Sequence, residues 1–136
     1  MKKIAIILPV FNEEKNLTKL VKILKKNLST PFFKDYRLKL LFINDGSTDK
    51  SWTLIKKFSK LNKLFSGINL QKNYGKELIM EYGLEFVRNF DAVIFIDSDL
   101  QHPPSMIKKL ILKWEASKKT ISIVKCIKLN SSKIGF

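Results

Sequence analysis

Short apolar runs alternate with amphipathic segments along the whole chain, and this alternation limits its fold more than any other feature. Residues 4–8 and 92–96 are continuously apolar, as expected for strands buried on both faces of a sheet. The predicted strands are residues 4–8, 38–43, 92–96 and, more weakly, 66–70, with a fifth beginning near Ile121, Ile123 and Cys126.

Apolar residues between the strands recur at helical spacing. They form four groups: Leu17, Leu20, Val21, Leu24 and Leu28; Leu54, Ile55, Phe58 and Leu61; Leu78, Ile79, Tyr82 and Phe86; and Ile107, Leu110, Ile111 and Trp114. We expect Asn12 to cap the first helix, and Pro103 and Pro104 to lie at the first turn of the fourth. This order predicts a single α/β domain over residues 1–136, with a mostly parallel sheet covered by helices on both faces.

The composition narrows the possible partners. The formal net charge is +14, which is typical either of a polyanion-binding protein or of a coding bias towards lysine. Only Arg37 and Arg88 are arginine, and sequence-specific nucleic-acid readers depend on arginine, so we expect no nucleic-acid partner. The single cysteine, Cys126, excludes a disulfide framework and fits a cytoplasmic setting. No apolar stretch approaches the ~20 residues of a membrane-spanning helix.

Three polar clusters follow predicted strands: residues 9–14, 44–49 and 97–104. In an open parallel sheet the carboxyl ends of the strands lie at one edge, and ligands bind outside that edge. The three clusters are therefore expected to meet at one binding site.

Two aspartates in the third cluster indicate a metal site. Asp97 and Asp99 follow a buried strand directly, and so much negative charge is costly without a cation. Carboxylate oxygens, with the amide oxygen of Gln101, suit Mg²⁺ or Mn²⁺ bridging a diphosphate. The alternative is a turn in which solvated aspartates cap the following helix.

Three further side chains each have two interpretations. Asp45 can accept hydrogen bonds from a base or a ribose, or it can serve the turn chemistry of Asp-Gly-Ser. Lys76 can neutralise phosphate or remain solvated. His102, the single histidine, can contact a metal or phosphate, or it can face solvent from a loop.

Four segments together resemble family-2 glycosyltransferases, most closely the branch of dolichol-phosphate mannose synthase and the undecaprenyl-phosphate sugar transferases. The segments are residues 8–14, 44–49, 73–76 and 97–104, and the resemblance runs from residue 4 to about residue 128. It implies a Rossmann-like GT-A fold and inverting, metal-dependent transfer from a UDP- or GDP-sugar, with a polyprenyl phosphate as the expected acceptor. The protein would then act in the cytoplasm, at the inner face of the membrane.

The resemblance also implies a set of site residues. The nucleotide-sugar positions are Pro9, Phe11, Asn12, Glu13, Asp45, Lys76, Asp97 and Ser98, and the metal positions are Asp97, Asp99 and Gln101. His102 and Ser105 stand where this branch commonly has acidic residues. Because family domains continue further, we expect a domain that is incomplete at its C-terminus. The alternative function is a truncated, non-catalytic remnant that binds nucleotide at most.

Overall fold

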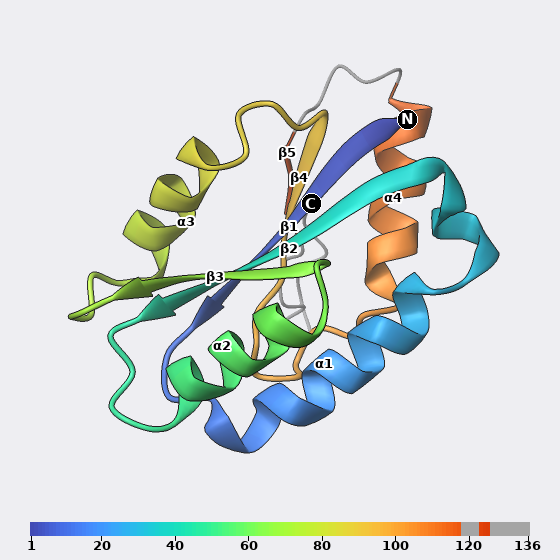
Figure 1. Ribbon diagram of the computed structural model, residues 1–136. Helices are drawn as coiled ribbons and strands as arrows, with labels where there is room; N and C mark the ends of the chain where they lie inside the picture. The colour runs from blue at the N-terminus through green and yellow to red at the C-terminus, as the bar shows by residue number, and fades with distance from the viewer. Residues whose placement is uncertain (118–122, 126–136) are drawn as a thin grey trace, which may run out of the picture.

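The computed structural model describes residues 1–117 and 123–125 and contains one five-stranded parallel sheet (Figure 1). Its strands are β1 (Lys2–Val10), β2 (Tyr36–Asp45), β3 (Phe65–Leu70), β4 (Ala92–Phe95) and β5 (Ile123–Lys125). Each neighbouring pair is parallel, which confirms the predicted α/β architecture. Ile121 and Cys126, which we assigned to the fifth strand, lie outside the described residues.

The strands are joined by helices, as the spacing of apolar residues predicts. The helices are α1 (Glu14–Leu28), α2 (Ser51–Leu61), α3 (Lys76–Glu85) and α4 (Met106–Ala116), with a short 3₁₀ turn η1 at Pro31–Asp35. Pro103 and Pro104 precede α4 rather than lying in its first turn, and their carbonyls accept hydrogen bonds from the first two helical residues. Among the described residues, no helix is both long and apolar enough to cross a lipid bilayer.

The strand order reverses its direction beside β1. Across the sheet the order is β3-β2-β1-β4-β5, so the chain builds outward from β1 to β3 and then returns to the other side of β1. In open parallel sheets ligands bind outside the carboxyl ends of the strands, at the point where the strand order reverses. The pair β1 and β4 forms this switch point here.

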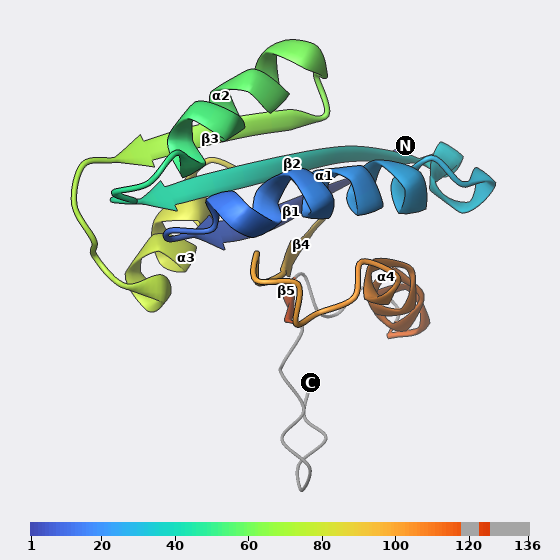
Figure 2. The ribbon, with the colours of Figure 1, turned by 90° about the horizontal axis from the view of Figure 1, so that it is seen from below.

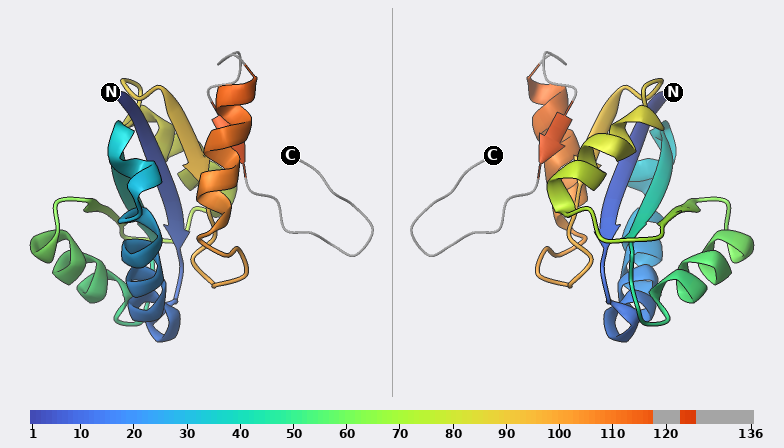
Figure 3. Two further views of the ribbon diagram at one scale, coloured as in Figure 1. Left: turned by 90° about the vertical axis from the view of Figure 1, so that its right-hand side faces the viewer. Right: turned by 90° about the vertical axis from the view of Figure 1, so that its left-hand side faces the viewer.

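Alternate residues of the strands enter two separate cores. Ile4, Ile6 and Leu8 pack with α1, α2 and α4, whereas Ala5 and Ile7 pack with α3. Figure 2 shows α1 running along β1 and β2, with α2 beside β3. The two views in Figure 3 show α1, α2 and α4 on one side of the sheet and α3 on the other. This confirms the prediction that both faces are covered.

Helix α3 packs along a narrower strip than its sequence pattern indicates. Ile79 is 2% exposed, but Leu78, Tyr82 and Phe86, which share its predicted apolar stripe, are 58%, 42% and 53% exposed. A Cβ on Gly83 would lie 2.6 Å from the Ile43 side chain, so α3 contacts the sheet where it has no side chain. That close approach leaves the other apolar side chains outside the contact.

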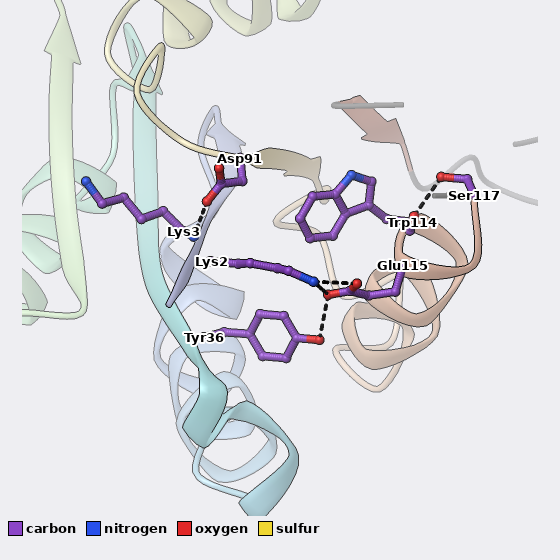
Figure 4. Close-up of polar contacts among 7 residues, drawn as sticks. All are labelled: Lys2, Lys3, Tyr36, Asp91, Trp114, Glu115 and Ser117. Atoms are coloured by element: carbon purple, nitrogen blue, oxygen red, sulfur yellow. Dashed lines mark hydrogen bonds and ion pairs between the residues drawn. The ribbon is translucent and has the colours of Figure 1, made fainter. Parts of the chain in front are cut away.

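Lys2, Tyr36, Trp114 and Glu115 join α4 to the edge of the sheet opposite the strand carboxyl ends (Figure 4). The Nζ of Lys2 lies 2.6 Å from both carboxylate oxygens of Glu115 and 5.6 Å from the ring centroid of Trp114. Burial raises the pKa of Tyr36, whose hydroxyl also donates to Glu115. These contacts fix the end of α4 that is remote from the predicted site.

Candidate functional site

A pocket of about 310 Å³ opens at the carboxyl ends of the strands and is lined by residues that follow β1 and β4. It is lined by Pro9, Val10, Phe11, Glu13, Asp45, Asn73, Gly75, Lys76, Ile79, Asp97, Ser98 and Asp99. The three polar clusters predicted from sequence therefore meet here, together with the start of α3. Other hollows in the described part of the chain have similar volumes, but this one gathers most of the predicted site residues.

Asn12 connects the first two clusters instead of lining the pocket. Its backbone has a φ of 51°, its amide N–H donates to Ser47 Oγ at 2.9 Å, and its Oδ1 accepts from the Thr48 amide at 2.8 Å. Our prediction that Asn12 caps α1 is wrong, because Glu13 holds the cap position and the helix begins at Glu14. The side chain of Asn12 stabilises the neighbouring loop, and its contact with a nucleoside stays a prediction.

Asp49 joins the N-termini of two helices. Its two carboxylate oxygens accept hydrogen bonds from the first amides of α1 and α2, Glu14 at 3.1 Å and Ser51 at 2.9 Å. Burial of Asp49 opposes its ionisation, but hydrogen bonds from Ser51 and Glu14 outweigh this effect and lower its pKa below 3.8. The charge also complements the positive ends of both helix dipoles.

Asp45 positions the loop that precedes α3. The residue is 3% exposed, and its carboxylate accepts hydrogen bonds from the amides of Tyr74 at 2.7 Å and Gly75 at 3.0 Å. Next to it, Gly46 has a φ of +69°, and a Cβ there would lie 2.4 Å from the backbone carbon of Lys72. Asp45 therefore has a structural role as well as a place in the pocket lining.

Asp97 lies between Lys76 and His102. Lys76 Nζ forms an ion pair with its Oδ1, and His102 Nδ1 lies 3.7 Å from its Oδ2. His102 is 5% exposed, which excludes the solvent-facing alternative for this histidine. The Asp97 amide also donates to His102 Nδ1 at 3.5 Å, so the imidazole packs against the base of the aspartate loop.

The rest of the third cluster is divided between the pocket and its outer surface. Ser98 Oγ donates to the Pro9 carbonyl at 2.7 Å and joins the end of β4 to β1. Asp99 lines the pocket, whereas Gln101 is exposed and lies outside the lining. The backbone amide of Gln101 donates to Asp99 Oδ1. Leu100 between them has a φ of 65°, a strained conformation for a branched residue and one that clusters at functional sites.

The oxygen donors fit a hard divalent cation that a nucleotide helps to bind. Among the described residues, no group of three or more His, Cys, Asp or Glu side chains is placed to hold a metal. Mg²⁺ usually takes one or two protein carboxylates and completes its shell with water and phosphate oxygens. Asp97 and Asp99 supply that number, and the ammonium of Lys76 beside Asp97 shows that the position accepts positive charge.

Sequence reasoning missed four residues of the lining: Val10, Asn73, Gly75 and Ile79. Ile79 belongs to the predicted apolar stripe of the third helix, and Val10 lies in the first polar cluster but was not among the predicted site residues. Asn73 and Gly75 belong to a segment that we recognised as a motif, but nothing in the sequence shows that Asp45 draws this segment to the pocket.

Comparisons with known proteins identify the family. The model of the family described as "Glycosyl transferase family 2" matches residues 5–133 of this chain. This chain belongs to that family. A bactoprenol glucosyl transferase of Shigella phage SfX is 37% identical to it over 114 residues, which is 84% of this chain and 36% of the phage protein. The chain thus spans about one third of the length of such family-2 relatives.

The fold is shared by other solved structures. Staphylococcus aureus TarS in complex with UDP matches with a TM-score of 0.64 and 23% identity, over 85% of this chain and 32% of that one. A mannosyltransferase from Pyrobaculum calidifontis, in complex with GDP-mannose and Mn²⁺, matches with a TM-score of 0.66 and 16% identity, over 83% and 32%. These similarities confirm the GT-A fold of this family-2 chain.

Proposed function

We propose that this chain binds a UDP- or GDP-sugar in the pocket at the strand carboxyl ends and takes part in inverting, metal-dependent transfer of the sugar to a polyprenyl phosphate. The observation that supports this most is the position of Asp97 and Asp99 at the β1–β4 switch point, in one pocket with Asp45 and Lys76. The pocket therefore combines oxygen ligands for a cation with a positive charge for phosphate.

The first two clusters are the proposed nucleoside-binding part. Phe11 is 47% exposed and lines the pocket, so its ring is available to a base. Pro9 and Glu13 line the same part, and the buried Asp45 carboxylate has lone pairs beyond those used by Tyr74 and Gly75. UDP in the Staphylococcus structure and GDP-mannose in the Pyrobaculum structure support the choice of these two nucleotide classes.

The third cluster and Lys76 are the proposed diphosphate-binding part. Asp97 and Asp99, with the neutral oxygen of Gln101, would hold Mg²⁺ or Mn²⁺. When bound, the metal neutralises negative charge on the departing diphosphate. Lys76 places its ammonium beside Asp97 and is close enough to the cluster to neutralise a phosphate oxygen. Ser98 keeps Asp97 and Asp99 at the pocket by holding the end of β4 against β1.

A polyprenyl phosphate is the acceptor that needs least additional chemistry. A hydroxyl acceptor requires a base, whereas a phosphate monoester with a second pKa of about 6 is already ionised near neutral pH and needs mainly to be positioned. The name of the phage relative, a bactoprenol glucosyl transferase, supports a lipid of this kind. With such an acceptor, the proposed site of action is the cytoplasmic face of the membrane.

Calorimetry with nucleotide and metal tests the donor site. We expect Mn²⁺ alone to bind weakly and to strengthen binding of UDP-glucose or GDP-mannose, because the diphosphate supplies missing ligands. Asp99→Ala should remove this gain, while Asp35→Ala, an exposed aspartate of η1, should leave it intact. Equal nucleotide affinity with and without metal in the unmodified chain would contradict the assignment.

Transfer of labelled sugar to undecaprenyl phosphate tests the acceptor. The purified chain would receive UDP-glucose, UDP-N-acetylglucosamine or GDP-mannose with Mn²⁺, and labelled lipid would be extracted and counted. Product formation supports the proposed reaction. Nucleotide binding without product under all three conditions would support the alternative of a non-catalytic remnant.

A further inference from the structure

In the described part of the chain, the net positive charge is concentrated on one side of the fold. Helices α1, α2 and α4 share one face of the sheet. Their exposed lysines are Lys15, Lys19, Lys22, Lys25 and Lys26 on α1, Lys56, Lys57 and Lys60 on α2, and Lys108, Lys109 and Lys113 on α4. The three helices contain two carboxylates, and one of them, Glu115, is bound to Lys2. We call this surface the lysine face.

The carboxylates lie elsewhere in the described chain. Helix α3, on the opposite face of the sheet, exposes Glu77, Glu81 and Glu85, and its one lysine, Lys76, pairs with Asp97. Apart from Glu14, which begins α1, five more carboxylates belong to the three polar clusters at the carboxyl ends of the strands. A coding bias towards lysine would add positive charge to every helix. It does not explain three lysine-rich helices on one face and an acidic helix on the other.

The arrangement of the lysines suits a diffuse negative surface. Lys15, Lys19, Lys22 and Lys26 follow one another at helical spacing, so they form a single row along α1 over about 16 Å. Lysine is a hydrated point charge on a flexible stem, whereas bidentate recognition of bases and phosphates uses arginine. These three helices contain no arginine.

We infer that the lysine face docks the protein on an anionic lipid bilayer. The choice of a bilayer over another polyanion rests on the polyprenyl-phosphate acceptor proposed above, since such an acceptor resides in a membrane. Glu13, which precedes α1, lines the pocket, and its backbone amide donates to Ser51 Oγ at the start of α2. The donor pocket therefore adjoins one end of the lysine face.

A pair of charge-matched variants tests this surface. The test variant is Lys19→Gln with Lys22→Gln and Lys26→Gln, all exposed on α1. The control variant is Lys3→Gln with Lys39→Gln and Lys63→Gln, which removes the same charge outside the three helices. None of these six lysines lines the donor pocket. Co-sedimentation with vesicles of phosphatidylcholine and phosphatidylglycerol, against phosphatidylcholine alone, measures partitioning.

The unmodified chain should sediment with the anionic vesicles, and added salt should release it. Each lysine close to an anionic surface contributes roughly a fivefold gain in partitioning, so the test variant should lose on the order of 100-fold. The control variant should lose far less. Equal losses in the two variants, or no binding of the unmodified chain, would overturn the proposal.

Two further measurements separate this inference from its alternatives. The affinity of the unmodified chain for short duplex DNA is compared with its affinity for anionic vesicles at the same salt concentration. Tighter binding to DNA would favour nucleic acid and overturn the lipid assignment. Calorimetry in the presence of Mn²⁺ should give both variants the same nucleotide affinity as the unmodified chain. If the unmodified chain binds nucleotide but not vesicles, only the docking surface is refuted. If the unmodified chain does not bind nucleotide, the proposed donor site is refuted.

Discussion

Replacing Lys76 by methionine should have opposite effects on metal and on nucleotide. In the structure Lys76 pairs with Asp97, the residue that we assign to the metal. A divalent cation that binds without nucleotide must therefore compete with the lysine for the same carboxylate. Once a diphosphate is present, the ammonium has a phosphate partner instead. Lys76→Met removes the competitor in the first case and a favourable contact in the second.

The exposure of the two side chains limits the size of the first effect. The side chain of Lys76 is 52% exposed and that of Asp97 is 22% exposed, so solvent screens the pair. Ion pairs of this kind contribute about 0.2–1 kcal/mol, and Mn²⁺ alone should bind at most about fivefold more tightly to Lys76→Met. A hydrogen bond to a charged group contributes about 1.5–3 kcal/mol. Taking the lower value for a half-exposed lysine, affinity for UDP in Mn²⁺ should fall by about tenfold.

Two titrations on the same samples check this prediction. Free Mn²⁺ measured by electron paramagnetic resonance gives the affinity for metal alone, and calorimetry gives the affinity for UDP. Lys72→Met is the matched control, since Lys72 is an exposed neighbour whose Nζ lies 5.1 Å from the Tyr74 ring centroid and outside the pocket lining. A Lys76→Met variant that binds Mn²⁺ alone more weakly than the unmodified chain would refute the competition. Unchanged UDP affinity would refute the phosphate contact.

Two other substitutions test how the loops around the pocket are held. Gly46→Ala should destabilise the fold by about 1–3 kcal/mol and weaken nucleotide binding, because its φ of +69° is strained for alanine and its Cβ would clash with the Lys72 backbone. Urea unfolding measures the first effect, and a wild-type midpoint would contradict it. Asp49→Asn should destabilise at neutral pH by about 1 kcal/mol, because Asp49 holds two helix N-termini. The folded pKa of Asp49 lies below 3.8, so its contribution is present above 3.8 and is lost as pH falls through the folded pKa. The difference in unfolding free energy between wild type and Asp49→Asn should therefore disappear in acid, whereas Asp35→Asn should show no such difference at neutral pH.

The strands could be predicted well because their signal is local. A buried parallel strand needs a continuous apolar run, and residues 4–8 and 92–96 provide one within β1 and at β4. Helix α3 shows where this reasoning fails. Its apolar spacing predicts a buried stripe, but Gly83 sets the approach to the sheet and leaves Leu78 and Tyr82 exposed. The spacing shows which side chains share a stripe and does not show which stripe contacts the sheet.

The positions of the site residues could be predicted, whereas their partners could not. Parallel strands bring their carboxyl ends to one edge, so eight of the predicted residues, Asp97 and Asp99 among them, line one pocket. The hydrogen bonds join residues far apart in sequence. Asn12 and Thr48 are 36 positions apart, and Asp45 and Gly75 are 30 apart. No local pattern indicates such pairs, which is why Asn12 resembled a helix cap.

The hydrogen-bond and ion-pair partners of the acidic residues show which carboxylates hold the pocket together and which are available to a ligand. Asp45 accepts two backbone N–H groups from the segment before α3, and Asp49 accepts one from Glu14 and one from Ser51. Losing either carboxylate would leave buried or capping amides without a partner. Asp97 differs, because its Oδ1 is paired with the flexible side chain of Lys76. A lysine can turn away without disturbing the backbone, so this carboxylate can exchange its cation at little cost. Motif residues bonded to backbone are therefore expected to affect stability when replaced, and Asp97 is expected to affect binding.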